Sequence, residues 1–286
     1  MSALPDLWTH KPRSVLTFRP GTRVADIDTN ATPGFSGEKS DAPDLQAERN
    51  GVFAALQEQL YACGKTGTDS RSVLLVLQGM DTAGKGGIVE HVVGAGNPMG
   101  IRYTSFGVPT AEERGHHYLW RIRKALPGPG MVGVFDRSHY EDVLVVRVHE
   151  LVPPDVWGAR YDEINAFEKE VTEAGTTIIK CFLHVSFAEQ KSRLAARLAS
   201  PAKYWKYNPK DVDARQKWPA YQEAYADALE RCNTDHAPWH VIPSDRKWYR
   251  NWAVAQLVRE HLIGLNLTWP EATFDVAAEK ARVAKS

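Results

Sequence analysis

Cysteine is scarce in this chain, and neither sign of charge is in excess. The 286 residues contain three cysteines, Cys63, Cys181 and Cys232, and because these are widely spaced they indicate neither a disulfide framework nor a zinc site. Lysine and arginine together number 35, as do aspartate and glutamate, so only a local cluster of charge can attract a polyanion. The N-terminus lacks the pattern of a signal peptide, and no apolar run is as long as a membrane span. We therefore expect a cytoplasmic protein without a membrane partner.

The length and composition predict one domain with additions at both ends. Residues 1–40 are rich in Pro, Gly, Thr and Asp without a sustained period, so we expect an extended arm there. Residues 41–270 have the apolar content of a single large core. Residues 271–286 are expected to form a loosely held C-terminal tail.

Short apolar runs alternate with helical patterns along the central part of the chain. Helices in parallel-sheet proteins separate successive strands in this way. The strands are expected at residues 72–77, 102–106, 132–135, 176–185 and 239–242. The fold class predicted is therefore α/β: a three-layer α/β/α sandwich around a mainly parallel five-stranded sheet.

Capping residues predict where several helices begin. Thr110 and Glu113 match a capping box for one helix that extends to the following Pro-Gly-Pro sequence. Ser186 is expected to cap a later helix, and either Ser244 or Asp245 the last long one.

A glycine-rich loop follows the first strand. Its spacing from Gly79 to Lys85 is G-x-x-x-x-G-K, which in other proteins wraps phosphates in backbone N–H groups, but Gly86 replaces the usual metal-binding hydroxyl. The loop instead contains Asp81, whose carboxylate would repel a phosphate unless a cation lay between them. The backbone groups expected to bind phosphate belong to Gly79, Ala83, Gly84, Gly86 and Gly87.

A second acid, Asp136, ends the strand expected at residues 132–135. Ligands of open α/β sheets bind at the carboxyl ends of the strands, so Asp136 is expected to face Asp81 there. Two carboxylates beside phosphates suit Mg²⁺, which makes both acids candidate metal ligands. Arg137 comes next in the chain and could bind phosphate oxygens through two of its guanidinium nitrogens.

Residues 191–217 are strongly basic in an otherwise neutral protein. We expect this segment to be a helical lid that closes over phosphates, although a solvated surface stretch is the ordinary fate of such a run. Its interleaved aromatic residues could also stack on single-stranded nucleic acid, but a nucleic-acid binder would not need Asp81. The candidate phosphate-binding cations of the lid are Arg193, Arg197, Lys203 and Lys206.

Histidine and serine chemistry is not favoured. His116 and His117 are adjacent on a helix and point in different directions, so they cannot share a metal. His139 follows the second acid and could contact phosphate, but a packed histidine is the more common case. Ser138 lacks the G-x-S-x-G pattern of a hydrolase nucleophile.

Four of these segments, in this order, resemble the polyphosphate kinase 2 family over residues 45–265. They are the glycine-rich loop with its unusual Asp81 and Gly86, residues 97–106, residues 135–144 and the basic segment 192–206. The resemblance implies a P-loop kinase-like fold, similar to thymidylate kinases, with a helical lid. It also implies phosphoryl transfer between inorganic polyphosphate and AMP or ADP, making ADP or ATP, with Mg²⁺ or alternatively Mn²⁺, in a homodimer or homotetramer.

The same resemblance assigns roles to individual residues. Asp81 and Asp136 would hold metal and orient the acceptor phosphate, Lys85 would contact the transferred group, and Arg137 would bind nucleotide phosphate. Arg121 matches a further arginine that contacts phosphate, and the lid cations would bind polyphosphate.

Three classes of function stay open on the sequence. The first is the polyphosphate-dependent nucleotide kinase. The second is an ATP-dependent kinase of a nucleoside monophosphate or small molecule, for which two or three lid cations would suffice. The third is a non-enzymatic protein that binds polyphosphate or nucleic acid, which Asp81, Lys85 and Asp136 disfavour.

Overall fold

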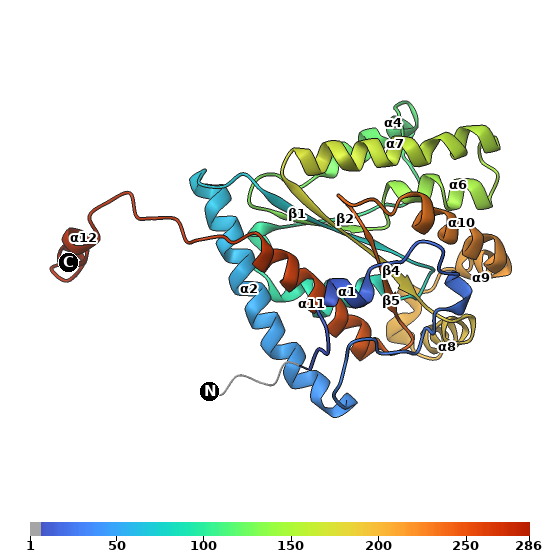
Figure 1. Cartoon of the computed structure of the whole chain (residues 1–286), viewed down its shortest axis with the longest axis horizontal. Helices are drawn as coiled ribbons and strands as arrows, with labels where there is room; N and C mark the ends of the chain where they lie inside the picture. The colour runs from blue at the N-terminus through green and yellow to red at the C-terminus, as the bar shows by residue number, and fades with distance from the viewer. Residues whose placement is uncertain (1–6) are drawn as a thin grey trace.

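The computed structural model describes residues 7–286 and contains a five-stranded sheet in the order β2-β3-β1-β4-β5 (Figure 1). All four neighbouring pairs are parallel, which confirms the predicted sheet. The strands are β1 (Ser72–Gln78), β2 (Ile101–Ser105), β3 (Val132–Asp136), β4 (Thr176–His184) and β5 (Trp239–Pro243).

Helices cover both faces of this sheet. Every residue of β1 is buried, because the central strand of a parallel sheet has a helix layer on each side. Its Leu75 packs in one core with α2 and α11, and its neighbour Leu74 packs in a second core with α5 and α7. The α-helices are α1 (Pro12–Leu16), α2 (Ala42–Thr66), α3 (Lys85–His91), α4 (Ala111–Arg114), α5 (Leu119–Ala125), α6 (Val145–Val148), α7 (Pro154–Glu173), α8 (Phe187–Leu198), α9 (Lys210–Gln216), α10 (Trp218–Arg231), α11 (Lys247–Gly264) and α12 (Val276–Val283). The predicted three-layer α/β/α sandwich is therefore present.

The N-terminal segment is fastened to the edge of the sheet. Phe18 is buried, and its backbone N–H donates to the carbonyl of Trp239 in β5 at 2.8 Å. Thr17 forms an antiparallel bridge to His240, and Leu16 and Val24 lie in the main core. The first forty residues, as far as they are described, thus contribute to packing, while the boundaries predicted at residues 40 and 270 stay a prediction.

Two of the predicted helix beginnings are confirmed. The predicted length of the helix that starts at Thr110 and the predicted cap of α11 are wrong. The capping box of Thr110 and Glu113 is present, as is the cap of α8, where Ser186 accepts from the N–H of Glu189 at 3.0 Å. The helix that starts at Thr110 does not continue, however. It ends at Gly115, and α5 begins only at Leu119, because glycine and two histidines propagate a helix poorly.

The cap expected for α11 is not formed by Ser244 or Asp245. The residue before α11 is Arg246, which makes no side-chain cap. Both candidates are engaged elsewhere: the hydroxyl of Ser244 donates to the carbonyl of Ile242, and Asp245 accepts from the N–H of Ser186 at 2.8 Å. A local carbonyl occupies Ser244, and a tertiary partner occupies Asp245, so neither side chain caps α11.

The C-terminal segment leaves the body of the protein, as Figure 1 shows, and ends in α12, in which no residue is buried. The tail predicted for residues 271–286 stays a prediction. Within residues 7–286, no helix combines the length and apolar character needed to cross a membrane.

Candidate active site

The glycine-rich loop joins β1 to α3 at the carboxyl edge of the sheet. Gly79 and Gly84 have φ values of 152° and 117°, which favour glycine, and Lys85 is buried as the first residue of α3. The Lys85 ammonium donates back to the carbonyl of Gly79 at 2.9 Å, across the loop. The loop is thus closed around its own lysine.

Two buried arginines donate hydrogen bonds to the backbone of the glycine-rich loop. Arg193 of α8 donates to the carbonyls of Thr82 at 2.8 Å and Ala83 at 3.1 Å. Arg250 of α11 donates to the same Ala83 carbonyl at 3.2 Å. These contacts orient the peptide groups that would face a ligand.

Arg250 also explains two of the loop glycines. A Cβ atom at Gly84 would overlap the Arg250 guanidinium, and one at Gly87 would lie 2.6 Å from its Nη2. A Cβ at Gly86 would meet no atom within 4 Å, and Gly86 lines the adjacent cavity. Two glycines therefore make room for Arg250, whereas the third leaves backbone open to a ligand.

The two predicted acids lie on neighbouring elements of the same edge. Asp136 is the last residue of β3 and is in register with Leu77 of β1, from which the loop departs. Nη2 of Arg137 lies 2.7 Å from Oδ1 of Asp81. Arg137 has φ 64°, and its N–H donates to the Leu77 carbonyl at 3.0 Å. A strained backbone at this position directs the arginine toward the loop.

Glu141 is a further acid of the site that the sequence analysis did not identify. Burial opposes the charge of Arg137, but Glu141 and Asp81 outweigh it and raise the pKa of this arginine. Burial raises the pKa of Glu141, and the positive charges of Arg137 and Lys85 oppose this effect. The charge of Arg137 is therefore stabilised by two carboxylates, of which Asp81 is in direct contact.

A fully buried ionic network follows Arg137 in the chain and joins His139 and Tyr140 to α7 and β4. The Lys180 ammonium lies 2.6 Å from Glu168 and 2.8 Å from the hydroxyl of Tyr140. His139 lies 3.1 Å from the same Glu168 and is 1% exposed, so it packs inside the protein and does not contact phosphate. Burial alone would raise the pKa of Glu168, but Lys180 and His139 hold it below its usual value.

These elements surround a cavity of about 810 Å³ lined by eight lysines and arginines and three carboxylates. All four predicted catalytic residues and all four predicted lid cations line it. Gly79, Ala83 and Arg121, which were predicted to bind phosphate, do not line the cavity. Arg121 is buried and donates to the carbonyl of Gly107 at 2.9 Å, so it supports the cavity wall that follows β2.

The lid residues fall into two groups. Arg193 lies under the loop, as described above. Lys203 and Lys206 are exposed on the 3-10 helix η6 (Pro201–Lys206), and within residues 7–286 neither has a carboxylate partner. Arg197 connects the groups, because it donates to the Lys206 carbonyl at 2.7 Å and to Asp211 at 3.2 Å.

The first turn of α11 was also missed by the sequence analysis. Lys247, Trp248, Arg250 and Asn251 line the cavity. The available signal was the pair of cations three residues apart at the start of the helix.

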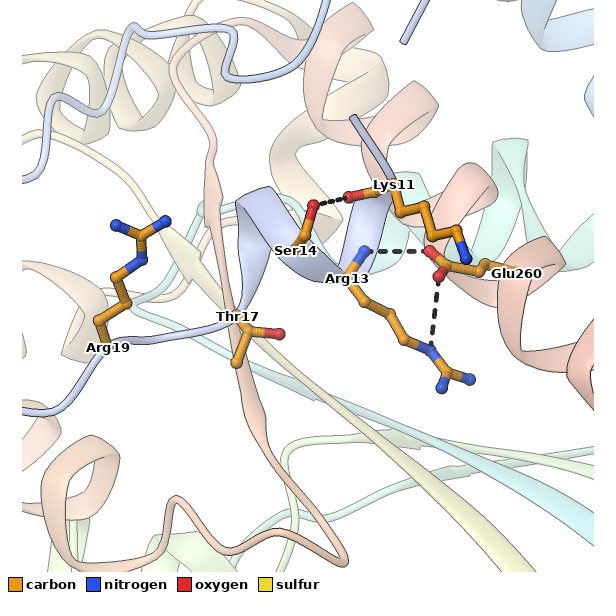
Figure 2. Close-up of a pocket in the computed structure, with 6 residues that line it drawn as sticks. All are labelled: Lys11, Arg13, Ser14, Thr17, Arg19 and Glu260. Carbon is orange, nitrogen blue, oxygen red and sulfur yellow. Dashed lines mark hydrogen bonds and ion pairs between the residues drawn. The ribbon is translucent and has the colours of Figure 1, made fainter. Parts of the chain in front are cut away.

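A second cavity, of about 460 Å³, lies between α1 and α11 (Figure 2). Figure 2 shows Arg13 joined to Glu260 by its backbone N–H and by its side chain, at 3.0 and 3.9 Å, while Arg19 stands apart. No residue of the glycine-rich loop or of a strand end lines this cavity. It is separate from the site described above, and its ion pair attaches the N-terminal segment to α11.

Asp81 and Asp136 supply only part of the ligand set that a metal ion requires. In the described part of the chain, no three His, Cys, Asp or Glu side chains form a cluster that would bind a metal by themselves. Two carboxylate groups beside a phosphate-binding loop fit a hard cation such as Mg²⁺, which takes its other ligands from phosphate and water.

A parallel sheet with a glycine-rich loop, a buried loop lysine and an acid on the neighbouring strand defines a P-loop phosphotransferase. Comparison with known proteins narrows the class. The profile of the family described as "Polyphosphate kinase 2 (PPK2)" matches residues 39–266. This chain belongs to the polyphosphate kinase 2 family, as the sequence motifs suggested.

Individual relatives are similar over most of their length. The chain is 46% identical over 254 residues to an "AMP/ADP-polyphosphate phosphotransferase" of Meiothermus ruber, covering 89% of this chain and 92% of that protein. It is 39% identical over 240 residues to an "ADP-polyphosphate phosphotransferase" of Rhodopseudomonas palustris, with 80% of each covered. The crystal structure of polyphosphate kinase 2 from Arthrobacter aurescens superimposes with a TM-score of 0.95 at 49% identity, over the whole of both chains.

Proposed function

We propose that this protein transfers the terminal phosphoryl group of inorganic polyphosphate to AMP or ADP, reversibly, and so makes ADP or ATP. The observation that carries the proposal is the cavity itself, in which eight cations surround a phosphate cradle flanked by two acids. The names of relatives that match most of this chain support the same substrates.

In the proposed reaction, a terminal phosphate oxygen of the nucleotide attacks the terminal phosphorus of polyphosphate. A new P–O bond forms, the P–O bond to the next phosphate breaks, and polyphosphate leaves one unit shorter with the electron pair on its oxygen. The attacking oxygen is already ionised, so no general base is required. The transition state is loose and its charge lies on the equatorial oxygens, which cations stabilise.

The residues divide this work by position. Lys85 and the backbone from Gly84 to Gly87 would bind the transferred group, and Arg137 would bind nucleotide phosphate. Asp81 and Asp136 would hold Mg²⁺, or alternatively Mn²⁺, which would neutralise phosphate charge when bound. Arg197, Lys203 and Lys206 would bind the polyphosphate chain.

The alternative functions make different demands on the cavity. An ATP-dependent kinase of a nucleoside monophosphate or small molecule would bind a single triphosphate and needs fewer cations than the eight present. A binding protein without activity would not require a buried Lys85 beside two acids. A homodimeric or homotetrameric state, a cytoplasmic location and the absence of nucleic-acid binding stay predictions.

The test is a donor comparison with purified protein, Mg²⁺, and AMP or ADP. Polyphosphate should give ATP or ADP in amounts that match the phosphate lost from the chain, and chelation of the metal should stop the reaction. If polyphosphate gives no nucleotide product while ATP phosphorylates AMP, the ATP-dependent alternative is correct. If neither donor reacts and polyphosphate still binds, the protein is a binder.

A further inference from the structure

The first turn of α11 forms part of the cavity wall beside the lid. Arg193 of α8 donates to the carbonyls of Ser244 and Asp245, which directly precede α11, so the two helices meet at this point. Lys247 and Arg250 of α11 line the same cavity as Lys203. Cations from two distant parts of the sequence thus share one space.

The charges of this turn are not matched by acids. Within residues 7–286, no carboxylate lies within ion-pair distance of Lys247 or Arg250. Arg250 is 3% exposed, and its donors reach only neutral oxygens, the amide of Asn251 at 2.8 Å and the Ala83 carbonyl at 3.2 Å. A buried cation is costly unless an opposite charge approaches it.

Neighbouring cations add to the unpaired positive charge of this turn. Like charges three residues apart on a helix repel each other. Burial and the neighbouring Arg193 lower the pKa of Arg250 to about 9. Burial and then Arg193 also lower the pKa of Lys247; Glu189 opposes them, and Arg250 and Lys203 add to the lowering. An anion that contacts several of these cations would relieve the repulsion.

The cavity wall on the β2 side has a different character. Tyr103, Ser105, Phe106 and Gly107 line it, and none of them is a cation. A nucleoside is uncharged and aromatic, so this side suits the base and sugar of a nucleotide. The cationic side is then left for the longer polyanion.

We propose that Lys247, supported by Arg250, binds polyphosphate beyond the phosphates held at the loop, so that the chain lies between η6 and the first turn of α11. The inference rests on the proposed function for the identity of the donor. It predicts a contact that long chains make and that tri- or tetraphosphate, confined to the loop, does not make. Lys247 is exposed, which makes it the residue to change without disturbing the fold.

The experiment compares Lys247→Gln with Lys191→Gln in the full chain. Lys191 is an exposed lysine of α8 that does not line the cavity, so it controls for loss of one positive charge. KM for long-chain polyphosphate should rise about fivefold in Lys247→Gln, the size expected for one exposed charge contact. KM for tetraphosphate, KM for ADP and kcat should stay within about twofold of wild type on the same scale.

Binding of polyphosphate alone, measured by calorimetry, should weaken by the same factor. This second readout separates the two proposals. A wild-type protein that binds polyphosphate but forms no nucleotide product overturns the proposed function and leaves the Lys247 contact in place. The inference is overturned if the wild type is active and neither variant changes KM for long-chain polyphosphate. It is also overturned if Lys247→Gln weakens nucleotide binding and leaves polyphosphate binding unchanged.

Discussion

Arg137 and Asp81 form an ion pair of 2.7 Å between Nη2 and Oδ1 that connects the end of β3 to the glycine-rich loop. The residues predicted to bind nucleotide phosphate and metal thus neutralise each other. A cation held by Asp81 would neutralise the same carboxylate that Arg137 neutralises in this structure. Burial opposes the charge of Arg137, and the carboxylates of Glu141 and Asp81 raise its pKa.

The two acids are expected to matter for turnover and not for folding. Asp81→Asn and Asp136→Asn should each lower kcat by about a hundredfold or more, because metal stabilisation of phosphoryl charge is worth several kcal/mol. Asp213→Asn, at an exposed acid of α9, is the matched control. Near wild-type rates at saturating Mg²⁺ in either site variant, with unchanged thermal unfolding, would refute the metal assignment.

The sequence was sufficient for the parts of this protein that are local. Strand β1 is a buried apolar run and the glycine-rich loop follows it, so the strand, its loop and Lys85 could be read from adjacent residues. Arg250 could not, because it lies 167 positions after Ala83, whose carbonyl it contacts, and the helical pattern of α11 gives no indication of that partner.

The lid shows the same limit. A cationic run predicts that a segment binds an anion, but it does not show which of its cations are available to do so. Lys203 lines the cavity without a carboxylate partner, whereas Arg193 donates its hydrogen bonds to carbonyls of the glycine-rich loop. Likewise Asp245 matched a helix cap, and only the fold brings Ser186 close enough to compete for its oxygen.

The glycines of the loop are expected to respond differently to alanine. Gly84→Ala should destabilise the protein by about 2 kcal/mol or more, because of its φ of 117° and the Arg250 guanidinium. Gly86→Ala should leave stability unchanged or raise it by up to about 1 kcal/mol, since the site is in α3. Gly86→Ala should nevertheless raise KM for polyphosphate. Denaturant unfolding and steady-state kinetics check both, and a Gly86→Ala enzyme with wild-type kinetics would show that no ligand approaches there.

Substitution of Arg193 is expected to lower stability, whereas substitution of Lys206 is expected to weaken substrate binding. Arg193→Ala should lower the free energy of unfolding by about 3 kcal/mol, because buried loop carbonyls lose a charged donor. Lys206→Ala should change it by less than about 0.5 kcal/mol, as is usual for an exposed side chain, and raise KM for polyphosphate alone. Equal stability of the two variants would contradict the position of Arg193 beneath the loop.

Glu168 is expected to stabilise the fold in its ionised form. Glu168→Gln should cost about 3–5 kcal/mol, since it leaves Lys180 buried without a counter-ion. The pKa of Glu168 is lowered by folding, so its contribution is present above the unfolded value of about 4.5 and is lost as the pH falls through the lower folded value. Unfolding measured from pH 6 downward should therefore show a shallower loss of stability for the variant. Glu223→Gln, at an exposed acid of α10, should follow the wild-type curve.

Asp211 is expected to have the opposite pH dependence. Burial and the negative charge of Asp81 raise the pKa of Asp211 to about 6, although Arg197 opposes them. Folding therefore favours the protonated carboxyl: the contribution is fully present below the unfolded value of 3.8 and is lost as the pH rises through about 6. Asp211→Asn should remove this loss, so that the variant gains on the order of 2 kcal/mol relative to wild type between pH 4 and pH 7. Denaturant unfolding across this range, in a chelating buffer, gives the difference curve. Asp213→Asn should give a flat difference curve, and a flat curve for Asp211→Asn as well would mean that Asp211 titrates as an ordinary surface acid.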